Sequence, residues 1–161
     1  MKLQLIFDAQ KRLDKAFSDN IDKKERELFD IKIVIALLVE LGEFANEVKA
    51  FKYWKKDKKI DRQKMLEEFA DGIHFITSIA YPLNVSSEIE PEIKYDNFNL
   101  QLALTYKLFC NLLENKNKES VFEAFKAYLG LGSLMNIKEN EIIESYLFKN
   151  QKNYQRIKDK Y

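Results

Sequence analysis

Apolar residues recur along the chain at the three- and four-residue spacing that is typical of amphipathic helices. In the first segment, Ile6, Leu13 and Phe17 follow this spacing and predict a helix over residues 3–18. One polar side chain, that of Gln10, falls inside the same apolar stripe. This stripe is the face that we expect to pack against the rest of the protein.

A second helix is predicted over residues 24–53, followed by a break at the basic run KKDKK, residues 55–59. Its middle segment, residues 31–41, is apolar nearly all round, and a helix of that kind is usually buried. We therefore expect it to be the central buried helix. A third helix is predicted to begin near Asp61, a residue type that favours helix N-caps, and to run to about Ala80.

The rest of the chain predicts one long loop and three more helices. Residues 81–97 contain both prolines and are expected to form the longest loop. The further helices are predicted over about residues 97–115, 118–130 and 138–158. The sequence LGLGS, residues 129–133, is expected to separate the last two. The whole chain, residues 1–161, is thus expected to be one all-α domain, a bundle of about six helices.

Composition agrees with long helices and shows no global charge field. Only 4 Gly and 2 Pro occur, which favours helices over turn-rich sheets. Lys plus Arg number 27 and Asp plus Glu number 26, so the formal net charge is +1. Charge-driven chemistry must therefore come from local clusters, and no nucleic-acid polymer is expected as a partner.

Three features indicate a soluble, cytoplasmic protein without a membrane partner. The N-terminal segment MKLQLIFDAQKRL carries charges every few residues and lacks the unbroken apolar run of a signal peptide. The longest apolar stretch, around residues 31–41, is too short to span a bilayer. The single cysteine, Cys110, cannot form an internal disulfide, and we expect it to fill the core in a reducing compartment.

Two of the predicted helices carry acidic residues at matching spacing. Glu40, Glu43 and Glu47 stand at i, i+3 and i+7 on the second helix, so their side chains share one narrow stripe. Glu68 and Asp71 stand at i and i+3 on the third helix. Both groups adjoin strongly apolar segments, where exposure of every carboxylate is hard to arrange.

A lone Glu-x-x-Glu is ordinarily a solvated helix face, but this group is larger and lies among apolar residues. Buried carboxylates repel one another, and each is costly to bury without a partner. Such a cluster persists only if a cation neutralises it or if some members are protonated, and we favour a metal site. Because all candidate ligands are oxygen atoms, the expected cofactor is Mg²⁺, with Mn²⁺ as a substitute. Mg²⁺ also binds substrate phosphates, which indicates a phosphate-bearing substrate.

Two glycines and one histidine adjoin the acidic residues. Gly42 precedes Glu43 and Gly72 follows Asp71, although glycine destabilises a helix interior. Their role stays open between a close helix approach at the metal site and ordinary tight packing. His74 follows Asp71 by three residues, and we expect it to support the site or the core rather than to bind the metal.

The last helix and the loop near Trp54 offer groups for a nucleotide. Lys149, Asn153 and Arg156 stand at i, i+4 and i+7, with Tyr161 five residues beyond. Two cations, an amide and a phenol suit a polyphosphate and a base edge, although a basic terminal helix is more often a solvated face. Trp54, the only tryptophan, lies beside lysines and either stacks on a base or anchors its loop.

The orientation of the last helix follows from the same pattern. Its opposite face carries Ile143, Leu147 and Tyr154, which we expect to point toward a core. In the substrate-free protein the cationic face should then lie across a water-filled cleft from the acidic residues, loosely held.

Together these motifs resemble the dimeric all-α dUTPase family, part of the wider MazG-like superfamily of nucleoside triphosphate pyrophosphatases. The resemblance covers most of the chain. It rests on ELGE at 40–43, FKYW at 51–54, EEFADGIHF at 67–75 and KNQKNYQR at 149–156. The paired acidic motifs are typical of the superfamily, and the other two segments are similar to the dUTPase branch.

The resemblance implies a metal-dependent active site. The four carboxylates that match Glu40, Glu43, Glu68 and Asp71 would hold the catalytic magnesium ions, two or more per site. Glu40 would also orient the attacking water.

The resemblance also implies how the nucleotide binds. Gln10 and Asn153 would read the uracil edge, while Lys149, Arg156 and Tyr161 would bind phosphates. The expected reaction is hydrolysis of dUTP to dUMP and pyrophosphate by a homodimer. A content of 12 Phe and 8 Tyr agrees with a dimer, because one small core cannot hide so much apolar surface.

Two alternatives remain open at this stage. A related enzyme could act on dCTP or on a broader set of nucleotides, and dUDP could be a second substrate. The chain could instead be an idle helical binding protein with the same fold. The intact acidic residues argue against the second alternative, since a pure binding protein has no need for four costly carboxylates.

Overall fold

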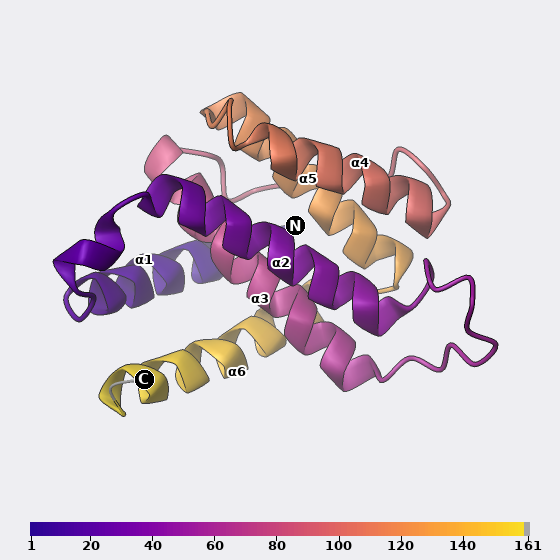
Figure 1. Cartoon of the computed structure of the whole chain (residues 1–161), viewed down its shortest axis with the longest axis horizontal. Helices are drawn as coiled ribbons and strands as arrows, with labels where there is room; N and C mark the ends of the chain where they lie inside the picture. The colour runs from indigo at the N-terminus through magenta and orange to yellow at the C-terminus, as the bar shows by residue number, and fades with distance from the viewer. Residues whose placement is uncertain (160–161) are drawn as a thin grey trace.

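The computed structural model describes residues 1–159, and within that range the chain forms six α-helices and no β-strand (Figure 1). The all-α prediction is therefore confirmed. The helices are α1 (Gln4–Ser18), α2 (Phe29–Val48), α3 (Arg62–Ala80), α4 (Phe98–Asn111), α5 (Lys118–Leu134) and α6 (Glu139–Lys158), with short 3₁₀ turns η1 (Lys23–Arg26) and η2 (Tyr81–Leu83). None of these helices combines the length and the apolar character needed to cross a membrane.

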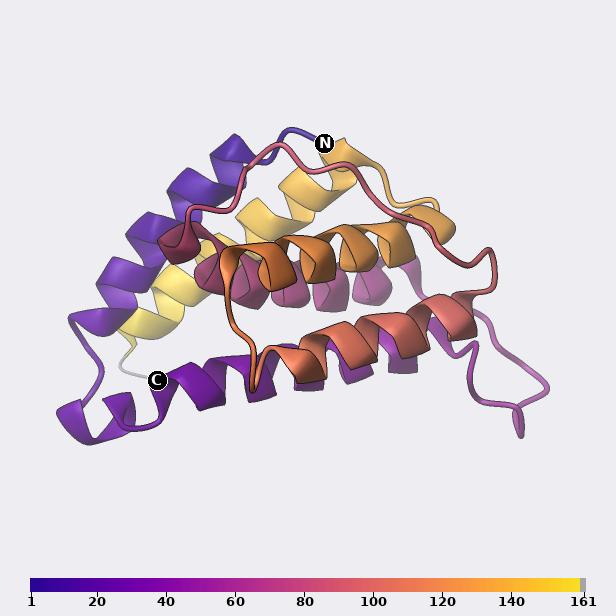
Figure 2. The ribbon, with the colours of Figure 1, turned by 90° about the horizontal axis from the view of Figure 1, so that it is seen from above.

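The helix at the centre of the fold is α3, with α1, α2, α5 and α6 packed against it. Figure 2 shows α2 and α4 along one side of the molecule, and α1 and α6 running diagonally on the other. The prediction that the second helix is the central buried one is therefore wrong. On α2, the side chains of Ile31, Ile35 and Val39 are 44%, 50% and 52% exposed, because no part of the described chain covers this face.

The ends of α2 differ from the prediction because two residues take left-handed backbone conformations. Leu28 has φ of 59° and Lys49 has φ of 64°, and these residues cap the helix at its two ends. Residues 24–26, expected in this helix, form part of η1 instead. The segment after Lys49 leaves the helix as a long loop that reaches α3, where the Asp61 side chain accepts hydrogen bonds from the backbone of α3 as predicted.

The predicted break at residues 129–133 lies inside α5, so this boundary is wrong. Its two glycines serve packing rather than termination. A Cβ atom at Gly130 would come within 2.0 Å of the carbonyl oxygen of Glu92, and one at Gly132 within 2.6 Å of the ring of Phe69. Small residues are therefore required where α5 meets the 81–97 loop and α3.

The expectation that Cys110 fills the core is also wrong, since its side chain is exposed. α4 turns Leu102, Thr105 and Phe109 inward, and the position after Phe109 points away from that face. α4 itself ends at Asn111, four residues before its predicted end.

An aromatic cluster joins α2, α3 and α5 beside the acidic residues. The ring centroids of Phe44 and Phe69 are 5.1 Å apart, and Phe69 stacks on Tyr128 at 4.5 Å. All three side chains are almost fully buried. Truncation of a buried aromatic side chain costs roughly 3–5 kcal/mol, so this cluster holds the three helices in a fixed register.

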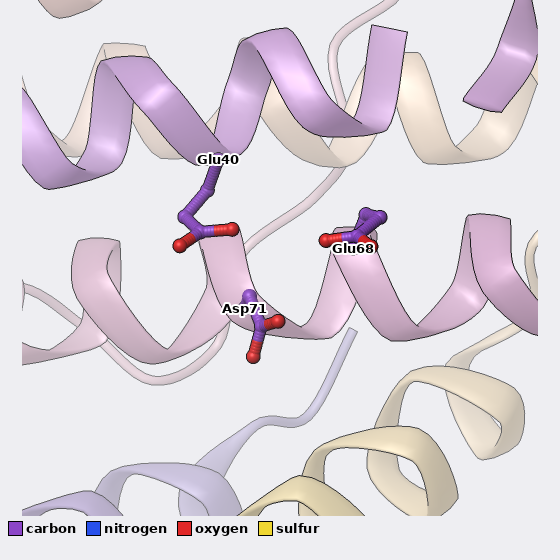
Figure 3. Close-up of side chains that lie close together, drawn as sticks. All are labelled: Glu40, Glu68 and Asp71. Carbon is purple, nitrogen blue, oxygen red and sulfur yellow. The ribbon is translucent and has the colours of Figure 1, made fainter. Parts of the chain in front are cut away.

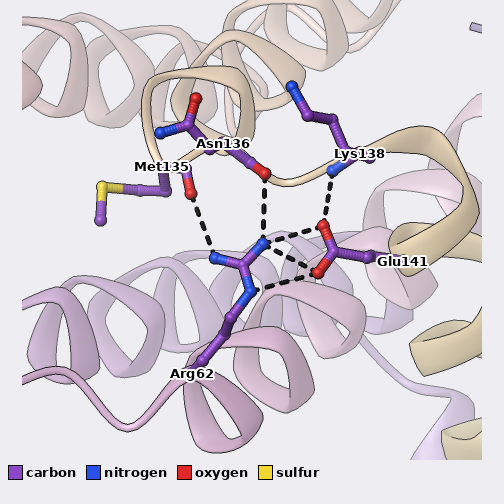
Figure 4. Close-up of polar contacts among 5 residues, drawn as sticks. All are labelled: Arg62, Met135, Asn136, Lys138 and Glu141. Atoms are coloured by element: carbon purple, nitrogen blue, oxygen red, sulfur yellow. Dashed lines mark hydrogen bonds and ion pairs between the residues drawn. The ribbon is translucent and has the colours of Figure 1, made fainter.

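Arg62 fastens the start of α3 to the start of α6 (Figure 4). Its guanidinium donates to both carboxylate oxygens of Glu141 at 2.8 Å and to the carbonyl oxygens of Met135 and Asn136. Glu141 also accepts a hydrogen bond from the backbone N–H of Lys138, at 3.0 Å. This contact ties the α5–α6 turn to α3 and so sets the direction in which α6 leaves.

Candidate active site

The acidic residues of α2 and α3 meet between these two helices. Glu40 on α2 faces Glu68 and Asp71 on α3, and one carboxylate oxygen from each residue lies within 4.8 Å of the other two. Figure 3 shows the three side chains converging on the space between the helices. All three are half-buried. The structure thus brings together three of the four carboxylates that the sequence singled out as ligands.

The aromatic cluster positions these carboxylates. Phe44 lies one turn after Glu40 on α2, and Glu68 directly precedes Phe69 on α3. Contact between the Phe44 and Phe69 rings therefore places the two acidic stripes opposite each other. Tyr128 reinforces this contact, since its hydroxyl donates to the carbonyl oxygen of Phe69 at 3.0 Å, within the turn that joins the two α3 acids.

The two glycines beside the acids make room for tyrosines. A Cβ atom at Gly72 would lie 2.2 Å from the hydroxyl oxygen of Tyr128, and one at Gly42 would lie 3.1 Å from that of Tyr106. The close approach is therefore made by α5 and α4, and not by α2 toward α3. Gly42 and Gly72 adjoin the acidic residues, so Tyr106 and Tyr128 pack tightly beside the acidic cluster.

The remaining acids of the α2 stripe lie at the edge of the cluster or beyond it. Glu43 is exposed, and its carboxyl group lies close enough to that of Glu68 to raise the pKa of Glu68. Glu47, one turn further along, is half-buried and does not belong to the group formed by Glu40, Glu68 and Asp71. The cluster therefore comprises three converging carboxylates and a fourth that joins through Glu68.

Burial and mutual repulsion keep these carboxyl groups protonated to unusually high pH. Burial, with the charges of neighbouring carboxylates, raises the pKa of Glu40 and that of Glu68 to about 7. The pKa of Asp71 is also raised, mainly by burial, while Lys149 opposes the shift. A cation among these groups would favour their ionised forms.

One oxygen in this cluster has no partner. Oε2 of Glu40 is buried and makes no hydrogen bond to any described part of the chain. A buried carboxylate oxygen of this kind is costly, and a cation that prefers oxygen ligands would satisfy it. The donor set is made of carboxylates alone, so the residues present fit Mg²⁺ or Mn²⁺ and do not suit Zn²⁺.

Lys149 on α6 is bound directly to this cluster. Its ammonium group forms an ion pair with Asp71, and the two side chains are only 12% and 16% exposed. The expectation of a cationic face held loosely across a water-filled cleft is therefore wrong for Lys149. The reason is that α6 packs on α3, which places Lys149 beside Asp71 without a gap.

Residues 2–161 match the family model described as dUTPase. The chain belongs to the dUTPase family. This membership confirms the resemblance seen in the sequence and implies a nucleotide pyrophosphohydrolase. The comparison with curated proteins gave no match.

The expected nucleotide-binding face of α6 is only partly exposed in this dUTPase family member. Asn153 is half-buried, and Arg156 donates a hydrogen bond to the Asn153 side chain at 3.3 Å. Arg156 also lies close enough to Asp71 to lower the pKa of that carboxyl. Lys149, Asn153 and Arg156 therefore share one face, as predicted. Tyr161 lies outside the described residues.

The face of α6 that enters the core is not the predicted one. Ile142, Tyr146 and Asn150 are buried, whereas Leu147 is 37% exposed. Ile143 and Tyr154 are half-buried at the margin. The inward face is thus partly polar, which the apolar pattern alone could not indicate.

Gln10, expected at the uracil edge in dUTPases, is 3% exposed and hydrogen-bonded on both sides of its amide. Its nitrogen donates to Asp14 at 2.7 Å and to Ser78 at 2.9 Å. Its oxygen accepts from Tyr146 at 2.7 Å and from Nδ1 of His74 at 2.8 Å. The amide is therefore a hub that joins α1, α3 and α6.

His74 is part of the core, as expected. Its ring stacks on that of Tyr146 with centroids 4.0 Å apart, and burial lowers the pKa of His74 to about 3. The imidazole is therefore neutral, and its Nε2 atom finds no hydrogen-bond partner in residues 1–159. His74 does not belong to the acidic group that could bind a metal.

Trp54 lies in the loop between α2 and α3, where its ring contacts neighbouring aromatic side chains of the same loop. Its side chain is 60% exposed, and it packs edge-on against Tyr53 and Phe51. Tyr53 is 89% exposed, so these rings form an aromatic surface on the loop. The choice between base stacking and loop anchoring thus stays a prediction.

Sequence patterns did not single out Tyr128 or Tyr146, although both position functional residues. Tyr128 braces α3 between its two acids, and Tyr146 binds Gln10. For the surroundings of Gln10, the sequence offers one local signal. Asp14 follows Gln10 by four residues, a spacing that allows a side-chain contact on a helix.

Proposed function

We propose that this protein hydrolyses dUTP to dUMP and pyrophosphate with Mg²⁺ held by Glu40, Glu43, Glu68 and Asp71. The observation that carries the proposal is the convergence of Glu40, Glu68 and Asp71, with oxygens within 4.8 Å of one another. Family membership supplies the substrate class. Two or more ions are proposed per site, and Mn²⁺ is expected to substitute.

The chain's own residues supply the water activation. Bound Mg²⁺ would contribute positive charge that offsets the phosphate charges and acidifies water. Glu40 orients the attacking water and accepts its proton. One feature of Glu40 supports this role: its buried Oε2 atom has no hydrogen-bond partner among residues 1–159 and is therefore available to a water molecule.

Cationic and amide side chains position the nucleotide in this proposal. Lys149 and Arg156 bind phosphate oxygens through charge-assisted hydrogen bonds. Asn153 and Gln10 read the uracil edge, which requires the Gln10 amide to exchange an internal partner for the base. Trp54 stacks on the base or anchors the loop, and Tyr161 contributes to the phosphates.

The choice between dUTP and other nucleotides is testable with a substrate panel. Pyrophosphate release is measured for each of the common dNTPs, with dUDP as a further substrate. We expect dUTP to be preferred over dCTP by about 100-fold or more, because a site built on amide hydrogen bonds rejects a mismatched edge. Equal rates would support a broader enzyme, and nucleotide binding without turnover would support the idle binding protein.

We further propose that the protein is a homodimer whose interface includes the exposed face of α2. Leu28, Ile31, Ile35 and Val39 follow helical spacing, and their exposed fractions are 64%, 44%, 50% and 52%. A contiguous apolar helix face of this kind is typical of protein–protein contacts. A second copy of the chain is the occupant that the family resemblance and the high aromatic content favour.

Light scattering tests this interface. The wild-type protein is expected to have the mass of a dimer, and Ile35→Glu is expected to shift it toward the monomer. Leu113→Glu is the matched control, since Leu113 is similarly exposed, at 43%, but lies outside the α2 face. A monomeric wild-type protein would contradict the dimer, and a dimeric Ile35→Glu variant would contradict this interface.

The cytoplasm is proposed as the compartment. Cys110 is a free, exposed thiol, which a reducing environment would preserve.

A further inference from the structure

Lys149 and a divalent cation would compete for the same carboxylate, that of Asp71. Its ammonium group pairs with Asp71, and that carboxylate also belongs to the group with Glu40 and Glu68. Both partners of the ion pair are largely buried, so water screens their interaction little. One carboxylate therefore serves the lysine and the proposed metal site.

The charges around Asp71 explain why a lysine is needed there. Glu40 and Glu68 are half-buried with few polar contacts, and Glu43 adds a fourth carboxylate through Glu68. Buried carboxylates without a counter-ion are strongly unfavourable. In the metal-free protein, Lys149 forms a direct ion pair with this group, and the charge of Arg156 also acts on Asp71.

α6 is fastened to α3 at two separate places, and only one involves a proposed metal ligand. Near its start, Glu141 binds Arg62 in a bidentate contact (Figure 4). Further along, Lys149 binds Asp71, and Lys152 lies 3.8 Å from Glu67. A change at Asp71 therefore affects the C-terminal half of α6 and leaves its start attached.

We propose that Lys149 is a place-holder for the divalent cation: it neutralises Asp71 in the metal-free protein and leaves that carboxylate when a cation binds there. Its ammonium group then becomes available to the phosphates of the nucleotide. A lysine suits this transfer because its charge is compact and its stem flexible, so it can change partners without moving the helix start. Metal binding would thus prepare the phosphate-binding face of α6 before substrate arrives. This inference rests on the proposed metal site.

Manganese affinity of the nucleotide-free protein tests the competition. Free Mn²⁺ is measured by electron paramagnetic resonance at pH 8, where carboxyl groups with a pKa of about 7 are ionised. Lys149→Met removes the charge and keeps an unbranched apolar stem. We expect this variant to bind Mn²⁺ about tenfold more tightly than the wild type, because the competing charge is gone. Lys149→Arg retains a competing charge and is expected to stay close to the wild type.

Lys152→Met is the matched control. Lys152 lies on the same helix and pairs with an acid of α3, but Glu67 is not in the acidic group. We expect its Mn²⁺ affinity to change less than about twofold, because more exposed charges are screened by solvent.

Hydrogen exchange separates a place-holder from a general effect of charge. In the wild type, Mn²⁺ alone should speed amide exchange in residues 150–158 and leave residues 139–145 unchanged. In Lys149→Met, exchange in residues 150–158 should be fast without Mn²⁺ and insensitive to it. A general effect of charge would change affinity without this local response.

The outcomes distinguish failure of the metal site from failure of the place-holder. If Mn²⁺ binds none of these proteins, the proposed metal site fails and the place-holder fails with it. If Mn²⁺ binds the wild type but Lys149→Met shows no gain in affinity, or exchange in α6 does not respond, only the place-holder is overturned. Tighter binding in Lys149→Met, with the exchange pattern above, supports it.

Discussion

The hydroxyl of Tyr146 on α6 donates a 2.7 Å hydrogen bond to the amide oxygen of Gln10 on α1. Both side chains are buried, at 0% and 3% exposure, and His74 shares the same acceptor. Through this contact α6 and α1 are locked together over α3.

We predict that Tyr146→Phe lowers the free energy of unfolding by roughly 1–3 kcal/mol, the usual cost of losing one partner of a buried hydrogen bond. Urea denaturation measures the change. Tyr154→Phe is the control, since Tyr154 is only half-buried and should change stability little. Equal stability of Tyr146→Phe and the wild type would show that the contact with Gln10 contributes nothing net.

Substitutions of acidic residues on α2 and α3 should distinguish the acidic cluster from its surroundings. We predict that Asp71→Ala and Glu43→Gln abolish turnover of dUTP while the helical circular dichroism spectrum is retained. Glu47→Gln, on the same stripe but outside the cluster, should keep near-normal activity. Near-normal activity in Asp71→Ala or Glu43→Gln would remove that residue from the proposed ligand set.

The guanidinium of Arg156 should contribute to phosphate binding. We predict that Arg156→Ala lowers kcat/KM by an amount worth roughly 1.5–3 kcal/mol, the scale of a hydrogen bond to a charged group. Arg156→Lys should recover only part of this loss, because a point charge cannot replace a bidentate fork. Steady-state kinetics measure both variants. An unchanged kcat/KM in Arg156→Ala would mean that this part of α6 is a solvated surface.

The raised pKa of Glu40 should make the metal-free protein less stable as pH increases. Its carboxyl group has a pKa of about 7 in the folded protein, against an ordinary value of 4.5, so folding favours the protonated form. The folded state therefore binds more protons between these values, and stability falls as pH rises through them. The loss is complete above about pH 7 and absent below pH 4.5.

We predict that Glu40→Gln melts at the same temperature as the wild type near pH 5 and roughly 2–5 °C higher near pH 8, both in EDTA. Buried His74 has a lowered pKa and destabilises the fold at low pH, but it is present in both proteins and cancels in the comparison. Differential scanning calorimetry across this range checks the prediction. A constant difference between the two proteins would contradict it.

The presence of each helix could be predicted from the spacing of apolar residues, because that spacing reports which face must be buried. The ends of α2 could not, since left-handed conformations at Leu28 and Lys49 are not favoured by those residue types. Gly130 and Gly132 resembled a helix break because glycine disfavours helix interiors. Their packing role could not be predicted, since the Glu92 carbonyl and the Phe69 ring that require small residues there come from distant segments.

The acidic cluster, like the helices, could be predicted from the spacing of residues. Carboxylates at i and i+3 on two apolar helices must meet if those helices pack, and Glu40, Glu68 and Asp71 do. The pairing of Lys149 with Asp71 and the burial of Gln10 depend on how α6 and α1 dock on α3. No local pattern in the sequence specifies that docking.

The most direct test of the central claim is the product analysis of dUTP incubated with the protein in Mg²⁺ and in excess EDTA. With Mg²⁺, we predict equal amounts of dUMP and pyrophosphate, and none of either in EDTA. Restoring Mg²⁺ or Mn²⁺ after chelation should restore the reaction without added zinc. Full activity in EDTA, or no hydrolysis of dUTP with Mg²⁺ present, would contradict a magnesium-dependent dUTP pyrophosphohydrolase built on these carboxylates.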